Sequence, residues 1–385
     1  MERFALPSEL EEFRGVLRRF CDEVVAPRAA AIDEKDEWPE DLHRAMVEQG
    51  LMGVGYPEEV GGSGGGALAF GLLIEELSRV SAGLSLTPTV AKLGVIPMEV
   101  AGDTEKAARL SRGIVSGELL MSYALTEPEA GSDAGAMRTR YLRDGDSFVL
   151  DGTKRFISGA GVSQAYVVFA TADPARGTSG ISAFLVMDDD PGFAVGRLED
   201  KMGVRGSPTG EVLLTGCRIP ADRLIGEEGK GFGYAMQTLD RSRPVIGAQA
   251  LGIAQGAFDV AARYALEREQ FGRPIAELAA IRTMLADMAM QIEASRMLVY
   301  RALEACDTGD PRVTYHASVA KCFAADAAME VTTDAVQILG GYGYIRDYPV
   351  ERFMRDAKIT QIYEGTNQIQ RVVIAREILK ALDGR

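Results

Sequence analysis

The sequence predicts an α+β fold in which an all-α region, a β region and a second helical region follow one another along the chain. Apolar residues recur at helical intervals in both end regions, whereas short runs of β-forming residues fill the middle. The length of 385 residues is too great for one ordinary core and favours two or three packed domains. We expect domains at 1–118, 119–228 and 229–385, packed into one compact subunit because no long polar linker separates them.

The first region begins with an amphipathic helix. Ser8 and Glu11 have the spacing of a capping box, in which each side chain bonds the other residue's backbone N–H. Apolar residues follow at helical intervals, at Leu10, Phe13, Leu17, Phe20 and Val24. Further helical patterns cover 42–51, 68–80 and 104–116, and the run GGSGGG at 61–66 is read as a surface turn between them.

The middle region predicts a β domain. Four short β-forming runs lie between turn-rich connections, at 148–152, 165–172, 181–187 and 211–217. Their spacing leaves no room for helical crossovers, so we expect an antiparallel sandwich or barrel.

The last region returns to the helical period. Ile281, Leu285, Met288 and Ile292 mark one helix, and similar patterns cover 317–339 and 368–382. A helical bundle is therefore predicted at the end of the chain.

Composition limits the possible functions. A formal net charge of −14 repels phosphate at long range and disfavours binding to nucleic acid or anionic membranes. The start of the chain shows no signal or transit pattern, and no uninterrupted apolar run is long enough to span a bilayer, so we expect a cytoplasmic protein. The only histidines, His43 and His316, are too few for a histidine metal site, and no metal is expected. The cysteines are widely spaced and predict reduced thiols: Cys21, Cys217, Cys306 and Cys322.

Two segments are candidates for a functional site. The turn-like segment 124–133, ALTEPEAGSD, is either an ordinary polar turn or a cradle of N–H groups and hydroxyls for the edge of a polar ring. In IYEGTNQIQR at 362–371, Glu364 is either a solvated surface charge or a base. Gly365 would allow close approach of a ligand, and the helix start that follows offers free N–H donors. The glycine-rich runs fit neither a P-loop nor GxGxxG, which disfavours a nicotinamide cofactor.

Five stretches, in this order, resemble the acyl-CoA dehydrogenases: YALTEPEAGSD, RFISGAG, ALEREQFGRPI, DAVQILGGYGYIRDYPVERFMRDAKI and QIYEGTNQIQR. The resemblance covers nearly the whole chain. It implies an α-helical N-terminal domain, a central antiparallel β domain and a C-terminal four-helix bundle, assembled as a homotetramer that is a dimer of dimers.

The resemblance also implies FAD between the β domain and the C-terminal domain. The ring is expected near Tyr123, Leu125 and Thr126, with Phe156 and Ser158 against it. Many members have Trp-Ile-Thr where this chain has Phe156-Ile157-Ser158, but the aromatic ring and the hydroxyl are kept. Contacts beside the base are expected from Thr366 and Gln368, and contacts to the FAD of a neighbouring subunit from Arg268, Phe271, Gln337 and Gly341. Without the resemblance, Arg268 would be a solvated charge and Phe271 a core residue.

For the acyl-CoA substrate, the matching positions are Gly365 beside the base and, along the CoA portion, Ser132, Ser207, Asp240, Arg243 and Arg312. By similarity, Glu364 removes the α-proton and flavin N5 accepts the β-hydride, which yields a trans-2-enoyl-CoA. The thioester oxygen would be held by the Glu364 N–H and a ribityl hydroxyl, and an electron-transferring flavoprotein would accept the electrons. Some relatives carry the base at the position of Ser242 instead.

Three alternatives remain open on the sequence: an acyl-CoA oxidase, a dehydrogenase of carrier-protein thioesters, and a homologue that binds flavin or acyl-CoA without turnover. Chain length is also open, because RFISGAG resembles short branched-chain members and DRSRPVIGAQALG resembles medium-chain members. We favour short, possibly branched, acyl groups.

Overall fold

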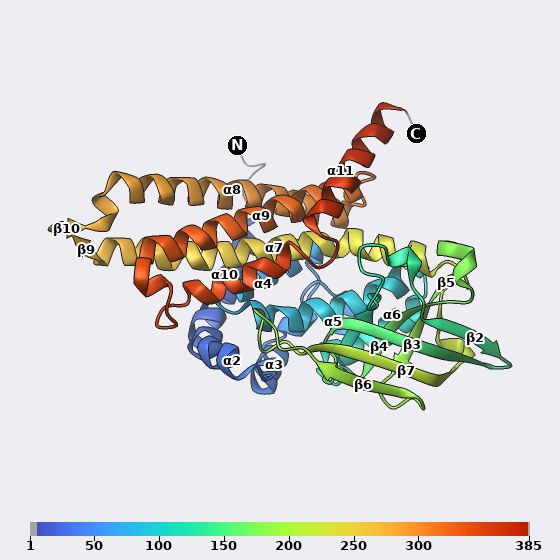
Figure 1. The fold of residues 1–385 in the computed structure, drawn as a ribbon. Coiled ribbons are helices and arrows are strands. Elements are labelled where there is room, and N and C mark those ends of the chain that lie inside the picture. The colour runs from blue at the N-terminus through green and yellow to red at the C-terminus, as the bar shows by residue number, and fades with distance from the viewer. Residues whose placement is uncertain (1–5, 384–385) are drawn as a thin grey trace.

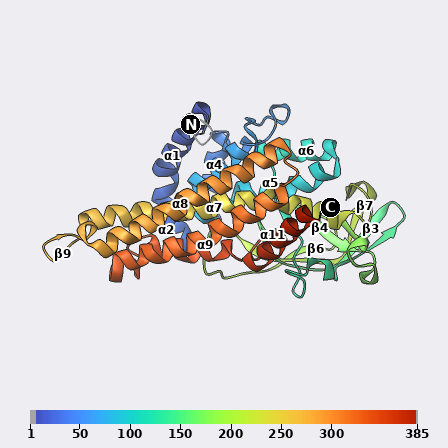
Figure 2. The ribbon, with the colours of Figure 1, turned by 90° about the horizontal axis from the view of Figure 1, so that it is seen from above.

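The computed structural model describes residues 6–383 and has the predicted fold class, with helices first, strands in the middle and helices last. Figure 1 shows the long C-terminal helices side by side, with strands β1 to β8 of the middle region gathered at one end of the molecule. The view from above in Figure 2 shows that α7 lies among α4, α5, α8 and α9. The domain boundaries stay a prediction, although the first strand begins at Met121 and the last helical region at Gly231.

The N-terminal helices are α1 (Ser8–Phe20), α2 (Ala29–Lys35), α3 (Glu40–Glu48), α4 (Gly66–Val80), α5 (Ala82–Ala101) and α6 (Thr104–Val115). The predicted capping box is wrong, because Pro7 is the N-cap and Ser8 is already helical. The Pro7 carbonyl accepts hydrogen bonds from the N–H groups of Leu10 and Glu11, so the helix begins one residue before the position that a Ser8 cap requires.

Helix α5 was not predicted. It is apolar on nearly all sides and contains Pro88 and Pro97, so it lacks the one-sided pattern of an amphipathic helix. It packs against α4, α7 and the first strand, which explains why it has no polar face. Ser81 caps it by accepting a hydrogen bond from the Leu84 N–H.

The β domain is one eight-stranded sheet of β1 (Met121–Ala124), β2 (Arg140–Asp144), β3 (Ser147–Ser158), β4 (Ala165–Thr171), β5 (Ile181–Met187), β6 (Phe193–Leu198), β7 (Thr209–Pro220) and β8 (Leu224–Ile225). Its order is β6-β7-β3-β2-β4-β5-β8, with β1 added on β4. The four predicted strands form, and they pair antiparallel, β3 with β7 and β4 with β5. The strands that were not predicted add parallel pairing, because β1 pairs parallel with β4 and β2 meets β4 through one parallel pair.

Strand β4 separates two cores. Ala165, Val167 and Phe169 face the large core of the helices, whereas Tyr166 and Val168 face the smaller core of the β domain. Burial on both faces explains why the whole strand is apolar. The sheet is thereby fixed against the helices.

The C-terminal region holds α7 (Gly231–Glu267), α8 (Ala279–Thr308), α9 (Val313–Leu339), α10 (Val350–Thr360) and α11 (Asn367–Leu382). Helices α7 to α10 pack on one another, and α11 packs on α9. A short hairpin, β9 (Glu269–Gln270) with β10 (Arg273–Pro274), joins α7 to α8 at the far end of the bundle (Figure 1).

Helix α7 is long and apolar enough to cross a membrane by length and composition, which the sequence analysis did not anticipate. However, 72% of its most apolar window is buried inside the fold, as in the core helix of a globular domain. All four cysteines are free, as predicted.

Candidate active site

The turn between α10 and α11 carries Glu364 in an unusual backbone conformation. Helix α10 ends at Thr360, and Thr366 starts α11 by accepting a hydrogen bond on Oγ1 from the Ile369 N–H. Between them Glu364 and Gly365 have φ values of +53° and +90°, in the left-handed region. This costs a non-glycine residue about 1–2 kcal/mol, so the surrounding structure has to hold the turn in place.

Side chains from three helices hold the turn. The Glu364 carbonyl accepts hydrogen bonds from Arg243 Nε on α7 at 3.3 Å and from Gln370 Nε2 on α11 at 3.2 Å. The Gly365 carbonyl accepts from Gln370 Nε2 at 3.0 Å and from Lys321 Nζ on α9 at 2.8 Å. The two carbonyls therefore point inward, and the Glu364 N–H makes no hydrogen bond within residues 6–383.

The Glu364 carboxylate is half-buried and bonded to α7. Ser242 Oγ donates to Glu364 Oε2 at 2.5 Å. Burial raises the pKa of Glu364 to about 6, while the Ser242 hydroxyl and the nearby Arg243 and Lys321 cations oppose the rise. A carboxylate with a pKa near working pH suits a general base.

Arg243 connects the turn to the start of α9. Its Nη1 donates to Asp240 Oδ1 at 2.6 Å, and Asp240 Oδ2 accepts from Thr314 Oγ1 at 2.7 Å. Arg243 is only 5% exposed, and burial lowers its pKa while Asp240 and Glu364 oppose this. Of the predicted CoA contacts, Arg243 thus contacts the Glu364 turn directly and Asp240 is linked to it through Arg243, and their contact with CoA stays a prediction.

The β domain contributes Tyr123 to the same region. Its hydroxyl donates to the Ala235 carbonyl of α7 at 3.5 Å, and its ring packs on Phe169. Burial, followed by the charge of Glu364, raises the pKa of Tyr123 well above its ordinary value, so the phenol stays neutral next to the carboxylate. Leu125, two residues further along the chain, is buried.

The other predicted ring contacts lie where β1 meets β3. The Arg155 N–H donates to the Thr126 carbonyl at 2.8 Å, which places Thr126 beside the bulge of β3 that carries Phe156. Phe156 is left-handed, with φ +58°, and 58% exposed. The side-chain hydroxyls of Thr126 and Ser158 form no hydrogen bond with residues 6–383. An exposed aromatic ring next to two available hydroxyls fits a large planar heterocycle with polar edges, such as the flavin of FAD.

Three of the remaining predicted FAD contacts form a separate cluster at the far end of the bundle. Arg268, Phe271 and Gly341 line a groove of about 450 Å³, with Tyr264 and Tyr342 on its apolar wall. Phe271 is 89% exposed, and Arg268 stacks on Tyr342. Gln337 is exposed on α9 and Gln368 on α11. Neither Glu364 nor Tyr123 lines this groove, and its contact with the FAD of a neighbouring subunit stays a prediction.

The predicted CoA contacts are not all brought together. Ser132 and Arg312 are exposed, on the 124–133 turn and at the N-terminal end of α9. Ser207 is buried beside Trp38 in a hollow of about 20 Å³, which is too small for a pantetheine chain. The contact of Ser207 with CoA stays a prediction.

Sequence reasoning missed the residues that support the base. Lys321 and Gln370 are fully buried, and neither was predicted, nor was the bond from Ser242 to Glu364. One signal was available for Lys321, which lies on the apolar face of a helix among Ala317, Ala320 and Ala324. A charged residue on such a face requires an internal partner.

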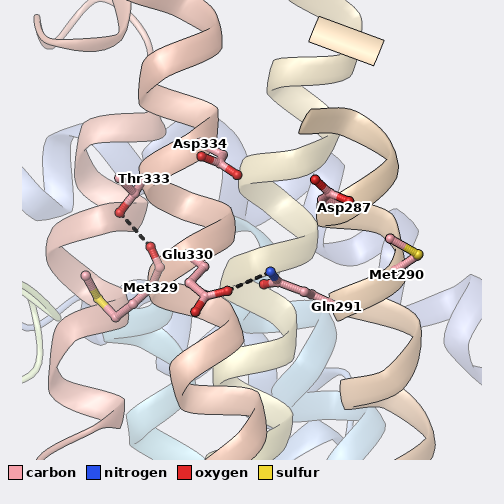
Figure 3. A pocket seen from close by; sticks show the side chains of 7 residues that line it. All are labelled: Asp287, Met290, Gln291, Met329, Glu330, Thr333 and Asp334. Atoms are coloured by element: carbon pink, nitrogen blue, oxygen red, sulfur yellow. Dashed lines mark hydrogen bonds between the residues drawn. The ribbon is translucent and has the colours of Figure 1, made fainter. Parts of the chain in front are cut away.

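A hollow between α8 and α9 lies elsewhere on the bundle (Figure 3). It has a volume of about 510 Å³ and presents Asp287, Glu330 and Asp334, with Glu330 accepting a hydrogen bond from Gln291 at 2.7 Å. Three carboxylates repel anionic ligands, and the hollow includes none of the predicted site residues. The chemistry is therefore sought at the Glu364 turn.

Known proteins match this chain along nearly its full length. The family descriptions "Acyl-CoA dehydrogenase, N-terminal domain", "middle domain" and "C-terminal domain" match residues 7–118, 122–217 and 229–379. A probable acyl-CoA dehydrogenase, fadE25 of Mycobacterium bovis, is 51% identical, with 98% of this chain and 97% of that protein covered.

Two similar proteins carry more specific names. The short-chain-specific acyl-CoA dehydrogenase of Clostridium acetobutylicum is 44% identical, with 98% of this chain and all of that protein covered. The solved structure of butyryl-CoA dehydrogenase from Megasphaera elsdenii superposes with a TM-score of 0.94 at 41% identity, with 98% of this chain and 99% of that chain covered.

Proposed function

Because this chain belongs to the acyl-CoA dehydrogenase family, an FAD-dependent family of oxidoreductases, we propose that it converts a short-chain acyl-CoA to the trans-2-enoyl-CoA with Glu364 as the base. The observation that carries the proposal is one residue with two functional groups. Glu364 presents a half-buried carboxylate with a pKa of about 6 and, on the same residue, a backbone N–H with no partner in residues 6–383.

Proton removal requires stabilisation of the product anion. The α-proton of a thioester is much too weakly acidic for an unassisted carboxylate, so the charge that develops on the thioester oxygen has to be bound. The Glu364 N–H is the donor that we assign to this oxygen. The left-handed turn keeps this N–H out of any helix, where it would be used in an internal hydrogen bond.

The side chains around Glu364 then set the pKa of its carboxyl group. Burial favours the neutral acid, whereas Ser242, Arg243 and Lys321 favour the carboxylate, and the balance leaves the pKa of Glu364 at about 6. At neutral pH the group is mostly ionised and accepts the proton. Closing the site with substrate excludes water and favours the neutral acid further.

The residues that we assign to FAD are the ring contacts Tyr123, Leu125, Thr126, Phe156 and Ser158, with Thr366 and Gln368 beside the base. FAD, when bound, supplies the acceptor for the β-hydride. Tyr123 lies next to Glu364, and its phenol stays neutral, so it adds no charge that competes with the carboxylate. Phe156 and the hydroxyls of Thr126 and Ser158 orient the cofactor.

We assign a short acyl chain because two similar proteins are named for such substrates, as butyryl-CoA dehydrogenase and as short-chain specific. An electron-transferring flavoprotein as electron acceptor and a dimer of dimers belong to the same proposal. In such an assembly the exposed groove of Arg268 and Phe271 would complete the cofactor site of a neighbouring subunit.

Anaerobic flavin bleaching tests the function. The FAD-loaded protein is mixed with acyl-CoAs of four, eight and sixteen carbons and with a branched short chain, and we expect the fastest bleaching with the short chains. Glu364→Gln should still bind FAD and acyl-CoA but bleach about a thousandfold more slowly, as expected when a general base is removed.

Glu377→Gln is the matched control, since Glu377 lies on α11 and its side chain bonds to Arg376 and Lys380 and to no other residue of the described range 6–383. Near-normal bleaching by Glu364→Gln would refute the assignment of the base. Preference for sixteen carbons would refute the short-chain assignment. Rapid peroxide formation in air would identify an oxidase instead, and no bleaching with any acyl-CoA would identify a binding protein without turnover.

A further inference from the structure

We propose that Lys321 is a positioning residue for the base: its ammonium group, buried in α9, holds the Glu364–Gly365 turn in its left-handed conformation and adds positive charge next to the carboxylate. The inference rests on the proposed function for its catalytic consequence, but its effect on the turn is independent of the reaction.

The burial of Lys321 requires an explanation. Its side chain is 0% accessible and lies on a helix face made mostly of alanine. An ammonium group loses several kcal/mol of solvation when it is buried, and a partner of opposite charge normally compensates. Lys321 forms no ion pair within residues 6–383, and its partners are neutral oxygens, the Gly365 carbonyl at 2.8 Å and Asn367 Oδ1 at 2.9 Å. Its charge is therefore kept at a cost to stability.

The two partners of Lys321 lie on either side of the start of α11. Asn367 is itself fixed, because its Nδ2 donates to the Cys322 carbonyl at 3.1 Å and to Asp326 Oδ1 at 2.7 Å. Lys321, Cys322 and Asp326 are all on α9, so one helix holds both the first residue of α11 and the Gly365 carbonyl two residues before it. Rotation of the Gly365 carbonyl away from Lys321 would move the neighbouring Glu364 peptide as well.

Glycine 365 leaves room for this contact. A Cβ at this position would lie 2.6 Å from Gln370 Nε2, the second donor to the same carbonyl. The carbonyl thus has two donors from two helices, and the glycine permits both. Lys321 is the only one of the two that carries a charge.

The charge acts on Glu364. Burial lowers the pKa of Lys321 to about 8, and Glu364 is the strongest of the groups that oppose this. The charged groups around Lys321 are Glu364, Arg243 and Asp326, with the Cys322 thiol beside them. Around Glu364 they are Arg243 on α7 and Lys321 on α9, and the neutral Tyr123 faces it from β1. A protonated Lys321 favours the Glu364 carboxylate, so its loss raises the pKa of the base.

The experiment replaces the ammonium group by an apolar side chain of similar length, Lys321→Met, in the FAD-loaded full-length protein. Hydrogen exchange of peptides covering 361–367 is measured without substrate, and kcat/KM and kcat are measured against pH with butyryl-CoA. We expect exchange in the turn to rise about tenfold, as for the loss of a hydrogen bond to a charged group. We also expect the acidic limb of kcat/KM to move up by about one pH unit, and kcat to fall roughly 10–100-fold with a much smaller change in KM.

Lys92→Met is the matched control. Lys92 on α5 also donates to a backbone carbonyl, that of Gly55 at 2.8 Å, and stacks on Tyr56, but it contacts no residue of the turn. Its variant should leave both the exchange of 361–367 and the pH profile unchanged. Lys321→Gln, which keeps polarity without charge, should move the acidic limb in the same direction.

Unchanged exchange and an unchanged acidic limb in Lys321→Met would overturn the proposal. If both Lys321 variants fail to accumulate as folded protein while Lys92→Met does, Lys321 is a residue of the folding core and the positioning role is also wrong. The outcome of the Lys321 experiment can be distinguished from the outcome of the Glu364→Gln experiment. An active Glu364→Gln would refute the assigned base and leave the exchange result standing, whereas an inactive Glu364→Gln with a normal Lys321→Met would refute only this inference.

Discussion

Removal of the Ser242 hydroxyl should make the enzyme more sensitive to acid without disabling it at high pH. Ser242 Oγ donates to Glu364 Oε2 at 2.5 Å, and the other acceptor within reach, the Leu239 carbonyl, is farther away at 3.3 Å. The donor therefore stabilises the ionised form of the base. In Ser242→Ala the carboxylate loses this bond, and the neutral acid becomes more favourable.

The size of the effect follows from the chemistry of this bond. A hydrogen bond to a charged group contributes about 1.5–3 kcal/mol, and one pKa unit corresponds to about 1.4 kcal/mol. The pKa of Glu364, about 6 with the hydroxyl present, should rise by about one to two units. Because only the ionised base accepts a proton, kcat/KM should fall roughly five- to fiftyfold at pH 6 and approach the wild-type value at high pH.

The assay is anaerobic stopped-flow reduction of the bound flavin by butyryl-CoA between about pH 5.5 and 9. Ser295→Ala is the control, since Ser295 is a buried helical serine whose hydroxyl bonds the Gln291 carbonyl of its own helix. Ser295→Ala should reproduce the acidic limb of the wild-type pH–rate profile. A loss of rate in Ser242→Ala that is equal at all pH values, or a limb that does not move, would show that the bond does not set the protonation of Glu364.

Two further predictions test other parts of the molecule. Asp356 is buried, and its Oδ1 accepts a hydrogen bond from the Val204 N–H. Burial raises the pKa of Asp356 to about 7, above the value of about 4 in an unfolded chain. The contribution of Asp356 to the free energy of unfolding is therefore present below about pH 4 and is lost as the pH rises toward 7. Asp356→Asn keeps the acceptor but cannot ionise, so its Tm relative to wild type should rise between pH 5 and pH 8; a constant difference would contradict this. Phe271→Ala removes a side chain that is 89% exposed and should leave Tm unchanged, but it should weaken FAD retention on dilution about tenfold if the ring contacts a neighbouring subunit's cofactor. If fluorescence shows equal FAD retention by Phe271→Ala and by the wild type, Phe271 does not contact the cofactor.

Two kinds of sequence pattern predicted much of the fold. Helices such as α8 show their helical period in the sequence, and strands such as β5, which is buried on both faces, appear as short runs of apolar β-forming residues. Helix α5 was missed because burial on nearly all sides removes the polar face that reveals a helix, and its two prolines resemble breaks. The parallel strand β1 was missed because four residues are too few to show alternation.

The site was predicted as far as local sequence determines it. The position of Glu364 before Gly365 and a helix start is visible in a ten-residue segment, and the structure has that turn. Its supports come from helices far away in the sequence. Ser242 and Lys321 precede Glu364 by more than forty residues, and no local pattern indicates that α7 and α9 meet at this turn. Contacts of this kind depend on tertiary packing, which periodicity does not encode.

The two roles that we propose for Glu364 account for its position on a turn. Within a helix such as α7 the backbone N–H of a glutamate would be bonded to the carbonyl four residues earlier and could not bind the thioester oxygen. A base at position 242 would therefore need its oxyanion donor from another residue. At position 364 the left-handed backbone frees the N–H and keeps it on the residue that carries the carboxylate, at a strain of about 1–2 kcal/mol. The hydrogen bonds from Arg243, Lys321 and Gln370 to the two turn carbonyls offset that strain, and two of these donors are cations that also favour ionisation of the base.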